Sequence, residues 1–211
     1  MTLASTPSTA PQGTYPAPAL VISECQRGIL EPERSVSKGL ADHAAARGII
    51  SRTAELARAF RVRGLPVVHC IIEHRADQKG MLPNSYLGTM ALRQRGMTAG
   101  TPDVEIPEEL GPEPEDIVSS RSTGITAFYG TDLDAMLRLQ KVDTIVLAGV
   151  STNVAIPGLA IEAVNRGYSV ILAEDCTAGA SEESHQFMVS NLLTILTRIS
   201  PAADIVRRLP D

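Results

Sequence analysis

Short apolar runs alternate along the chain with longer segments in which apolar residues recur every three or four positions. The apolar runs are ALVISEC, VVHCII, DTIVLAG and YSVILAED, at 19–25, 67–72, 143–149 and 168–175. Continuous apolar runs of this length, bounded by polar residues, are typical of strands buried on both faces of a sheet. The pattern therefore predicts four such strands.

Helix-like segments lie between the predicted strands. One apolar helical face runs from Ile49 to Phe60, and residues 131–140 and 153–167 precede the third and fourth runs. A last helix is predicted from about Ser181 to Ile199, with Ser181 as its N-cap. This β-α-β-α order predicts an α/β fold, a three-layer αβα sandwich with a mainly parallel sheet and right-handed crossovers.

Two segments lack this pattern. Residues 1–18 contain Ser, Thr, Pro, Gly and Ala without periodicity, so we expect a flexible N-terminal tail followed by one domain at 19–211. The tail lacks the basic start and apolar core of a secretory signal, which favours a cytoplasmic protein. Residues 74–115 are rich in Gly, Pro, Asn and Arg, and are predicted to form a lid or an oligomer arm with a short helix at 86–94.

Composition narrows the possible partners. The 211 residues carry a net charge of -5 and no dense basic cluster, which argues against nucleic acid as a partner. Neither a GxGxxG fingerprint nor a P-loop occurs, so dinucleotide and nucleotide cofactors are not expected. Three cysteines without a CxxC pair indicate a reducing compartment rather than a disulfide framework. A small-molecule partner, no membrane and no cofactor are the expectations.

Polar residues follow each predicted strand. In an open parallel sheet, ligands bind beyond the carboxyl ends of the strands, so these residues are candidates for a site. They are Glu24, Gln26, Glu73, His74, Ser151, Thr152, Asn153, Glu174 and Asp175.

Three segments of the chain carry a family resemblance. ALVISECQRGIL resembles the ALVVIDMQ opening of the isochorismatase-like hydrolases, also called the cysteine hydrolase superfamily, and RSTGITAFYGTDLDAML resembles their second motif. The stretch from TIVLAGVSTNVA to AEDCTAGASEESH resembles the segment that carries their nucleophile. The resemblance implies an αβα fold with a six-stranded sheet, a homodimer or homotetramer, and hydrolysis of amides or of a vinyl ether.

By the same resemblance, this chain departs from the family's catalytic residues at three positions. The family uses Asp, Lys and Cys, and these positions fall here on Glu24, Ser122 and Ala155, with Arg121 as the nearby cation. The chain is thus expected to be a divergent member that lacks the cysteine nucleophile. A methyl group cannot form a thioester, so a covalent thiol route is disfavoured.

We therefore predict non-covalent acid/base catalysis by Glu24 on a small carboxylate, vinyl ether or amide, with Arg121 binding an anionic group. Backbone N–H groups of the 151–155 turn would face an anion or oxyanion. The predicted substrate-binding residues are Gln26, Tyr129, Ser151, Thr152 and Asn153. The alternative is a catalytically silent relative that binds a small anion or serves as an oligomeric scaffold.

The remaining reactive side chains favour structural roles. Cys25 and Cys70 are predicted to be buried apolar groups, and Cys176 is a weak candidate nucleophile because no base is paired with it. His69 is predicted to lie in the core, and His43 and His185 on helix surfaces. His74 is better placed for function, but no second His lies near it for a zinc site, so no metal is expected.

Overall fold

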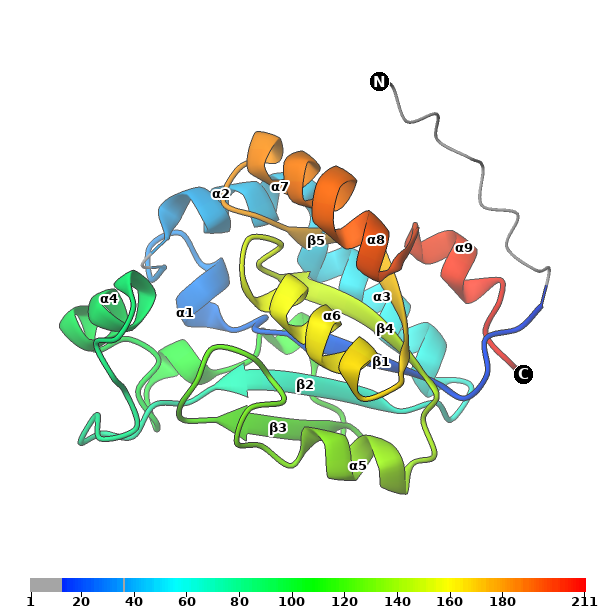
Figure 1. Ribbon diagram of the computed structural model, residues 1–211, viewed down its shortest axis with the longest axis horizontal. Helices are drawn as coiled ribbons and strands as arrows, with labels where there is room; N and C mark the ends of the chain where they lie inside the picture. Colours follow the sequence, from blue (N-terminus) through cyan, green and yellow to red (C-terminus); the bar gives the residue numbers. More distant parts are fainter. Residues whose placement is uncertain (1–12, 36) are drawn as a thin grey trace.

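A six-stranded, all-parallel sheet forms the centre of the protein in a computed structural model, which describes residues 13–35 and 37–211 (Figure 1). The strand order is β3-β2-β1-β4-β5-β6. The strands are β1 (Pro18–Ser23), β2 (Val67–Ile72), β3 (Ile117–Arg121), β4 (Thr144–Val150), β5 (Ser169–Ala178) and β6 (Arg198–Ser200). The predicted fold class is confirmed.

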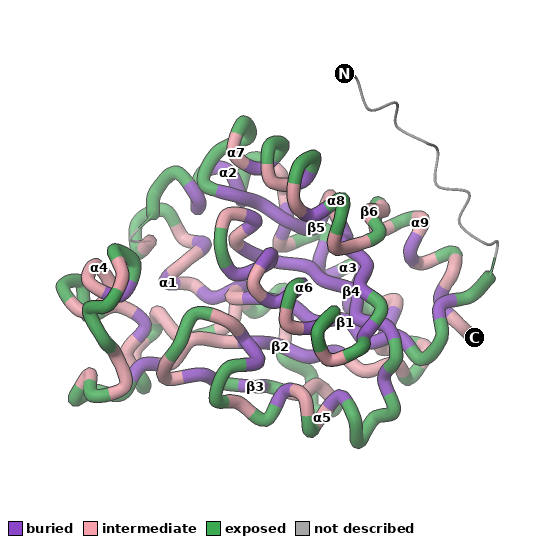
Figure 2. Tube along the Cα trace, viewed as in Figure 1, coloured by how far each residue is buried: buried purple, intermediate pink, exposed green. Residues whose placement is uncertain are grey.

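Helices cover both faces of the sheet, because alternate strand residues point to opposite faces. In β1, Leu20 and Ile22 belong to one hydrophobic cluster, and Ala19 and Val21 belong to the other. The first cluster is completed by α1 (Arg27–Leu30), α2 (Lys38–Arg47), α3 (Ile49–Arg61) and α9 (Ala202–Val206). The second is completed by α5 (Leu133–Leu139), α6 (Ala155–Asn165) and a π-helical stretch (Val189–Leu193) between α7 (Glu182–Met188) and α8 (Thr194–Leu196). Figure 2 shows the buried residues following the central strands.

The four apolar runs correspond to β1, β2, β4 and β5, as predicted. The prediction of one helix from Ser181 to Ile199 is wrong at its end: helical structure stops at Leu196, and Arg198–Ser200 pairs with β5 as the edge strand β6. Ser181 is the N-cap, and its hydroxyl accepts from the Ser184 amide at 3.2 Å.

The N-terminal segment is partly bound to the domain. The prediction of a tail concerns residues 1–18, of which 1–12 lie outside the described residues. Tyr15 is buried, its amide donates to the Arg208 carbonyl at 2.9 Å, and the Arg208 guanidinium lies 4.4 Å from the centre of its ring. The packed structure therefore begins a few residues before the predicted boundary at Ala19.

The long connection between β2 and β3 carries the predicted short helix, α4 (Tyr86–Gln94), and two 3-10 turns, Pro102–Val104 and Glu108–Leu110. Figure 1 shows α4 standing away from the sheet, at the end where β2 and β3 finish. Gly88 is the one buried residue of α4. This helix therefore packs little against the described protein and borders the region that the carboxyl ends of the strands open into.

Gly149 sets the geometry at the end of β4. Its φ is +99°, and a Cβ built there would lie 2.2 Å from the Ser23 carbonyl oxygen of β1. Only glycine combines this backbone conformation with so close an approach. β1 and β4 thus stay in contact up to the point where their following residues, Glu24 and Ser151, enter the site. No helix among the described residues has the length and apolar character to cross a lipid bilayer.

Candidate active site

A cavity of about 620 Å³ lies beyond the carboxyl ends of β1 to β4, where a parallel sheet is expected to bind ligands. Glu24 follows β1, Ile72 ends β2, Arg121 ends β3, and the turn after β4 supplies Ser151 and Asn153–Ala155. The outer wall comes from α4 and from the segments around it. The sequence predicts a site at this sheet edge and a lid or an oligomer arm at 74–115, but no motif assigns residues of α4 to the site.

Glu24 lies at the inner end of the cavity. Its amide still pairs with the Cys70 carbonyl of β2 at 2.8 Å, and its φ of +54° turns the chain out of the strand. The side chain is 16% exposed. Burial raises the pKa of the Glu24 carboxyl above 4.5, although the neighbouring Arg121 charge acts in the opposite direction. The structure thus holds at the cavity a carboxyl group that retains a proton more readily than one in water.

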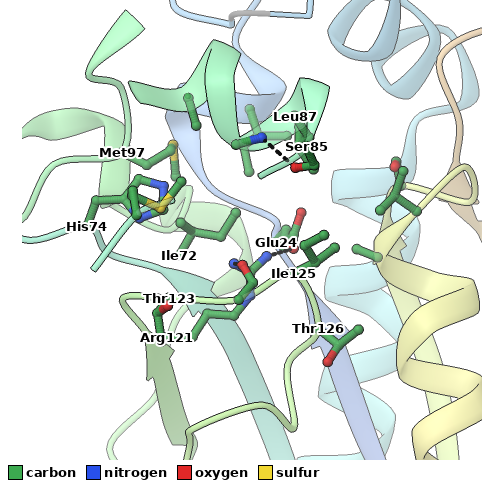
Figure 3. Close-up of a pocket in the computed structure, with 18 of the residues that line it drawn as sticks. Glu24, Ile72, His74, Ser85, Leu87, Met97, Arg121, Thr123, Ile125 and Thr126 are labelled. Atoms are coloured by element: carbon green, nitrogen blue, oxygen red, sulfur yellow. Dashed lines mark hydrogen bonds and ion pairs between the residues drawn. The ribbon is translucent and has the colours of Figure 1, made fainter. Parts of the chain in front are cut away.

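Arg121 is the partner of Glu24. Figure 3 shows the two side chains facing each other, with Arg121 Nη2 donating to Glu24 Oε1. Arg121 Nη1 donates to the Gly124 carbonyl at 3.2 Å, and the side chain is only 7% exposed. Ser122, where the resemblance places the family lysine, does not line the cavity. The guanidinium is therefore bonded to Glu24 and to the Gly124 carbonyl, and its binding of an anionic group of the substrate stays a prediction.

The turn after β4 leads into α6 beside the cavity. The Ser151 carbonyl accepts from the amides of Val154 and Ile156, at 3.2 and 3.0 Å, and Asn153 Oδ1 accepts from the Ala180 amide at 2.6 Å. Ala155, the first residue of α6, is buried and lines the cavity. In the first turn of α6 the Ile156 amide is bonded to the Ser151 carbonyl and Pro157 has no N–H, so the Ala155 amide and the helix dipole are what this end offers to a negative charge.

Two predicted substrate-binding residues are placed elsewhere. Gln26 is fully buried: its side-chain amide donates to the Ile72 and Val104 carbonyls at 2.8 and 2.9 Å and accepts from the Ile72 amide at 2.7 Å. Thr152 is also fully buried, and its hydroxyl contacts His185 Nδ1 at 3.2 Å. Neither lines the cavity. Gln26 instead fixes the strand end, and Thr152 anchors the turn from behind.

Tyr129, Ser151 and Asn153 do line the cavity, as predicted. Tyr129 lies at the mouth with its ring against Gly124, where a Cβ would approach Tyr129 Cδ1 to 2.4 Å. Further lining residues were not identified from the sequence. Some lie within the family motifs but carry no charge or reactive group that would single them out: Ile29, Thr123, Ile125 and Thr126. Others lie outside these motifs: Leu40, Ile72, Met81, Ser85, Leu87, Ala91 and Met97. His74, noted as well placed, also borders the cavity.

No cysteine is among the described cavity-lining residues. Cys25, Cys70 and Cys176 are free thiols and all buried, as predicted for Cys25 and Cys70, which lie in the two different hydrophobic clusters. Burial raises the pKa of Cys70 and of Cys176 to about 12 and that of Cys25 further still. These thiols are poor nucleophiles at neutral pH because the reactive species is the thiolate.

A buried polar cluster supports the turn from behind. The prediction that His43 and His185 lie on helix surfaces is wrong. His185 lies between Thr152 and Glu174, with Nε2 2.9 Å from Glu174 Oε1, and Arg47 Nη2 donates to the same carboxylate at 2.6 Å. His43 Nδ1 lies 2.9 Å from the Gly179 carbonyl. His69 is a core residue, as expected, with Nε2 3.0 Å from Asp116 Oδ2.

Among the residues that the structure describes, no three His, Cys, Asp or Glu side chains converge closely enough to hold a metal ion. The polar groups that line the cavity are those of Glu24, Arg121 and His74 and neutral hydroxyl and amide groups.

Comparison with known proteins places the chain in a family. Residues 18–204 match the model of the isochorismatase domain. An uncharacterized isochorismatase family protein, YecD, of Escherichia coli O157:H7 is 32% identical over 199 residues, which are 90% of this chain and 95% of that protein. The ureidoacrylate amidohydrolase RutB of Methylobacterium radiotolerans is 27% identical over 202 residues, covering 87% of this chain and 76% of that protein.

Solved structures of isochorismatase family proteins have the same fold as this chain. An isochorismatase family protein from Desulfovibrio vulgaris subsp. vulgaris str. Hildenborough has a TM-score of 0.79 at 24% identity and covers 91% of this chain and 99% of that one. A Burkholderia thailandensis isochorismatase family protein has a TM-score of 0.73 at 28% identity, covering 93% and 97%. On the domain match and the YecD similarity together, this chain belongs to the isochorismatase family.

Proposed function

We propose that this chain is a hydrolase in which Glu24 transfers a proton and no covalent enzyme intermediate forms. The observation that carries the proposal is a buried carboxyl at the inner end of a cavity that has no cysteine among its described lining residues. Relatives named ureidoacrylate amidohydrolase and maleamate amidohydrolase support hydrolysis as the reaction class. The missing thiol favours direct attack by water over a thioester route.

Glu24 can act in both halves of such a reaction. The protonated carboxyl gives its proton to the departing atom of the substrate as the scissile bond breaks. Water adds to the substrate, and its proton returns to the Glu24 carboxylate, so the group is regenerated and one water is consumed. Arg121 stabilises the carboxylate between these steps through its hydrogen bond to Oε1.

The end of α6 supplies the electrostatic part of the proposal. Ala155 begins that helix at the cavity wall, on the side where Ser151 and Asn153 also lie. A reacting carbonyl directed toward this end would place its developing negative charge near the helix N-terminus.

A turnover screen with amides, esters and enol ethers tests the proposal, with Glu24→Gln as the critical variant. Glutamine keeps the shape of the side chain and removes its transferable proton. Glu73→Gln is the matched control, because Glu73 also follows a strand but does not line the cavity. We expect turnover to fall at least about 100-fold in the first variant and to be unchanged in the second. Equal turnover in all three proteins would refute the proposal.

One observation favours the alternative of a binding protein: Glu24 Oε1 is already engaged by Arg121. That alternative predicts ligands that raise the melting temperature of the wild type and of Glu24→Gln equally, with no turnover by either.

We also propose that the protein forms a homodimer or homotetramer, as the family resemblance implies. Light scattering at several protein concentrations tests this proposal, and a monomer at all of them would exclude it.

A further inference from the structure

Charge is balanced within the cavity. Among its described lining residues, Glu24 is the one acidic side chain and Arg121 the one guanidinium, and the two form an ion pair with each other. His74 is the other titratable base on the wall, and burial and then the nearby Arg121 charge lower its pKa below 6.5. The cavity therefore offers no uncompensated positive charge to an anionic ligand.

A carboxylate bound here would have to compete for Arg121. Its guanidinium is held on one side by Glu24 and on the other by the Gly124 carbonyl, with 7% of the side chain exposed. Displacing Glu24 from it would leave a largely buried carboxylate unpaired, which is costly. An uncharged ligand avoids this cost.

Most of the remaining wall is apolar, although neutral Ser, Thr, Asn and Tyr side chains also line it. Leu87 and Ala91 of α4 line the cavity together with Met81, Met97 and Ile72. In Figure 3, Leu87 lies on the α4 side of Glu24, and Met97 and Ile72 lie to one side of Glu24. The apolar surface therefore begins next to the carboxyl. Leu87 is 51% exposed, an apolar side chain with little protein covering it. A ligand in the cavity would cover this surface.

The size of the cavity indicates how large the apolar part of the ligand can be. At about 620 Å³, it falls within the range of roughly 300–1,000 Å³ that is typical of sites for drug-sized ligands. A short aliphatic amide would fill only part of it and would leave the α4 wall uncovered. Methionines such as Met81 and Met97 adapt their shape to apolar groups of different outline.

We propose that the substrate is an uncharged amide, ester or enol ether with a medium-length alkyl or an aryl group. Its scissile group contacts Glu24, and its apolar group packs between α4 and the Met97–Ile72 side of the cavity. This inference rests on the proposed function for its reaction class, whereas its statement about charge and size concerns binding alone.

Binding of matched probes to the wild-type protein, measured by calorimetry, tests the inference. The primary amides from acetamide to octanamide vary the chain length, hexanoate puts a negative charge at the scissile end, and the monoamide of adipic acid puts one at the far end. We expect affinity to rise by up to roughly 4-fold for each buried methylene, and both anions to bind at least about 10-fold more weakly than hexanamide. Anions that bind as tightly as hexanamide, or affinities independent of chain length, would overturn it.

Two neighbouring residues of α4 provide a matched pair of variants. Leu87 lines the cavity, whereas Tyr86 is 82% exposed and does not line it. We expect Leu87→Ser to weaken octanamide binding at least about 3-fold and Tyr86→Ser to leave it unchanged. Equal effects of the two variants would count against α4 as the apolar wall.

Binding and turnover separate the two proposals. If long neutral amides bind as expected but no amide, ester or enol ether is hydrolysed, the proposed function fails and the inference about the ligand stands. If Glu24-dependent turnover is found only with short or anionic substrates, the inference fails and the proposed function stands.

Discussion

Arg121 donates a hydrogen bond to Glu24 across the inner end of the cavity, joining two residues that lie 97 positions apart in the sequence. The pair brings the end of β1 and the end of β3 together, although β2 lies between them in the sheet. It also gives the carboxyl two opposing influences: burial favours its protonated form and the guanidinium favours its ionised form. A carboxyl in that balance can both give and take a proton.

Replacing Arg121 by Met should destabilise the protein more at pH 8 than at pH 5. Without the guanidinium, the pKa of Glu24, already above 4.5, rises further, so the folded state binds a proton that the unfolded state does not. Folding then becomes less favourable as pH rises. We expect a loss of about 2–4 kcal/mol in urea unfolding at pH 8, a smaller loss at pH 5, and partial recovery in E24Q/R121M.

The matched control for that variant is Arg75→Met, since Arg75 forms an exposed ion pair with Asp77. This change should leave the urea midpoint unchanged at both values of pH. A loss in Arg121→Met that is the same at pH 5 and pH 8 would show that Glu24 does not respond to its partner.

The cluster behind the 151–155 turn should make stability depend on pH between about 5 and 7. Burial lowers the pKa of His185 below 6.5, against the opposing effect of Glu174; Arg47 and His43 also face it and oppose its protonation. As pH falls through 6.5, the unfolded chain takes a proton that the folded chain resists, so stability is lost. Replacing His185 by Asn should reduce this loss, as measured by urea unfolding at pH 7 and 5.5.

The same variant should be less stable than the wild type at pH 7 by about 1–3 kcal/mol, because Glu174 and Thr152 each lose a buried partner. A residual pH dependence is expected from His69, whose pKa is also lowered by burial. If the free energy of unfolding of His185→Asn falls as steeply between pH 7 and 5.5 as that of the wild type, protonation of His185 is not the cause of the pH dependence.

Alkylation of the native thiols should leave activity intact. Cys25, Cys70 and Cys176 are buried with raised pKa values, so at pH 8 few thiolates are present to react with iodoacetamide. We expect slow labelling of the folded protein, complete labelling in urea, and full turnover after mild treatment. Inactivation traced to one of these thiols and prevented by substrate would revive a covalent mechanism.

Restoring a thiol in the cavity should not by itself create an efficient amidase. Ala155→Cys would place a sulfur on the cavity wall, but Arg121 holds the carboxyl of Glu24, and Ser122, where the resemblance places the family lysine, does not line the cavity. We expect amide turnover to rise less than about 10-fold. A larger gain, abolished by alkylation, would show that Glu24 and Arg121 already supply what a thiol nucleophile needs.

The central strands could be predicted because β1, β2, β4 and β5 are continuous apolar runs, and burial on both faces leaves that pattern in the sequence. The edge strands leave a weaker pattern of apolar residues in the sequence. In β3, Val118 and Ser120 are exposed, and β6 has only three residues, so neither forms an apolar run. The last helix was consequently extended through β6.

The location of the site could be predicted from the sequence, but the full set of residues that line it could not. Glu24 and Ala155 line the cavity because they follow strand ends, which family motifs mark. Thr152 was misplaced although its neighbours, Ser151 and Asn153, face the cavity: side chains alternate there, and the middle one points back toward His185. The contacts that bury His43 cross more than 130 residues, to Gly179 and Glu182, and no local pattern reports such contacts.

The pH dependence of kcat/KM for Glu24→Gln and Glu24→Asp, measured beside the wild type on one substrate from the screen, tests the role of Glu24 most directly. If the protonated carboxyl is the acid, wild-type kcat/KM should fall as pH rises through a pKa above 4.5, and Glu24→Gln should lose this limb and at least about 100-fold in rate. Glu24→Asp should keep the limb at reduced rate, because its carboxyl is withdrawn by about one ångström. Wild-type rates and an unchanged pH profile in Glu24→Gln would contradict the proposal that Glu24 is the proton-transfer group.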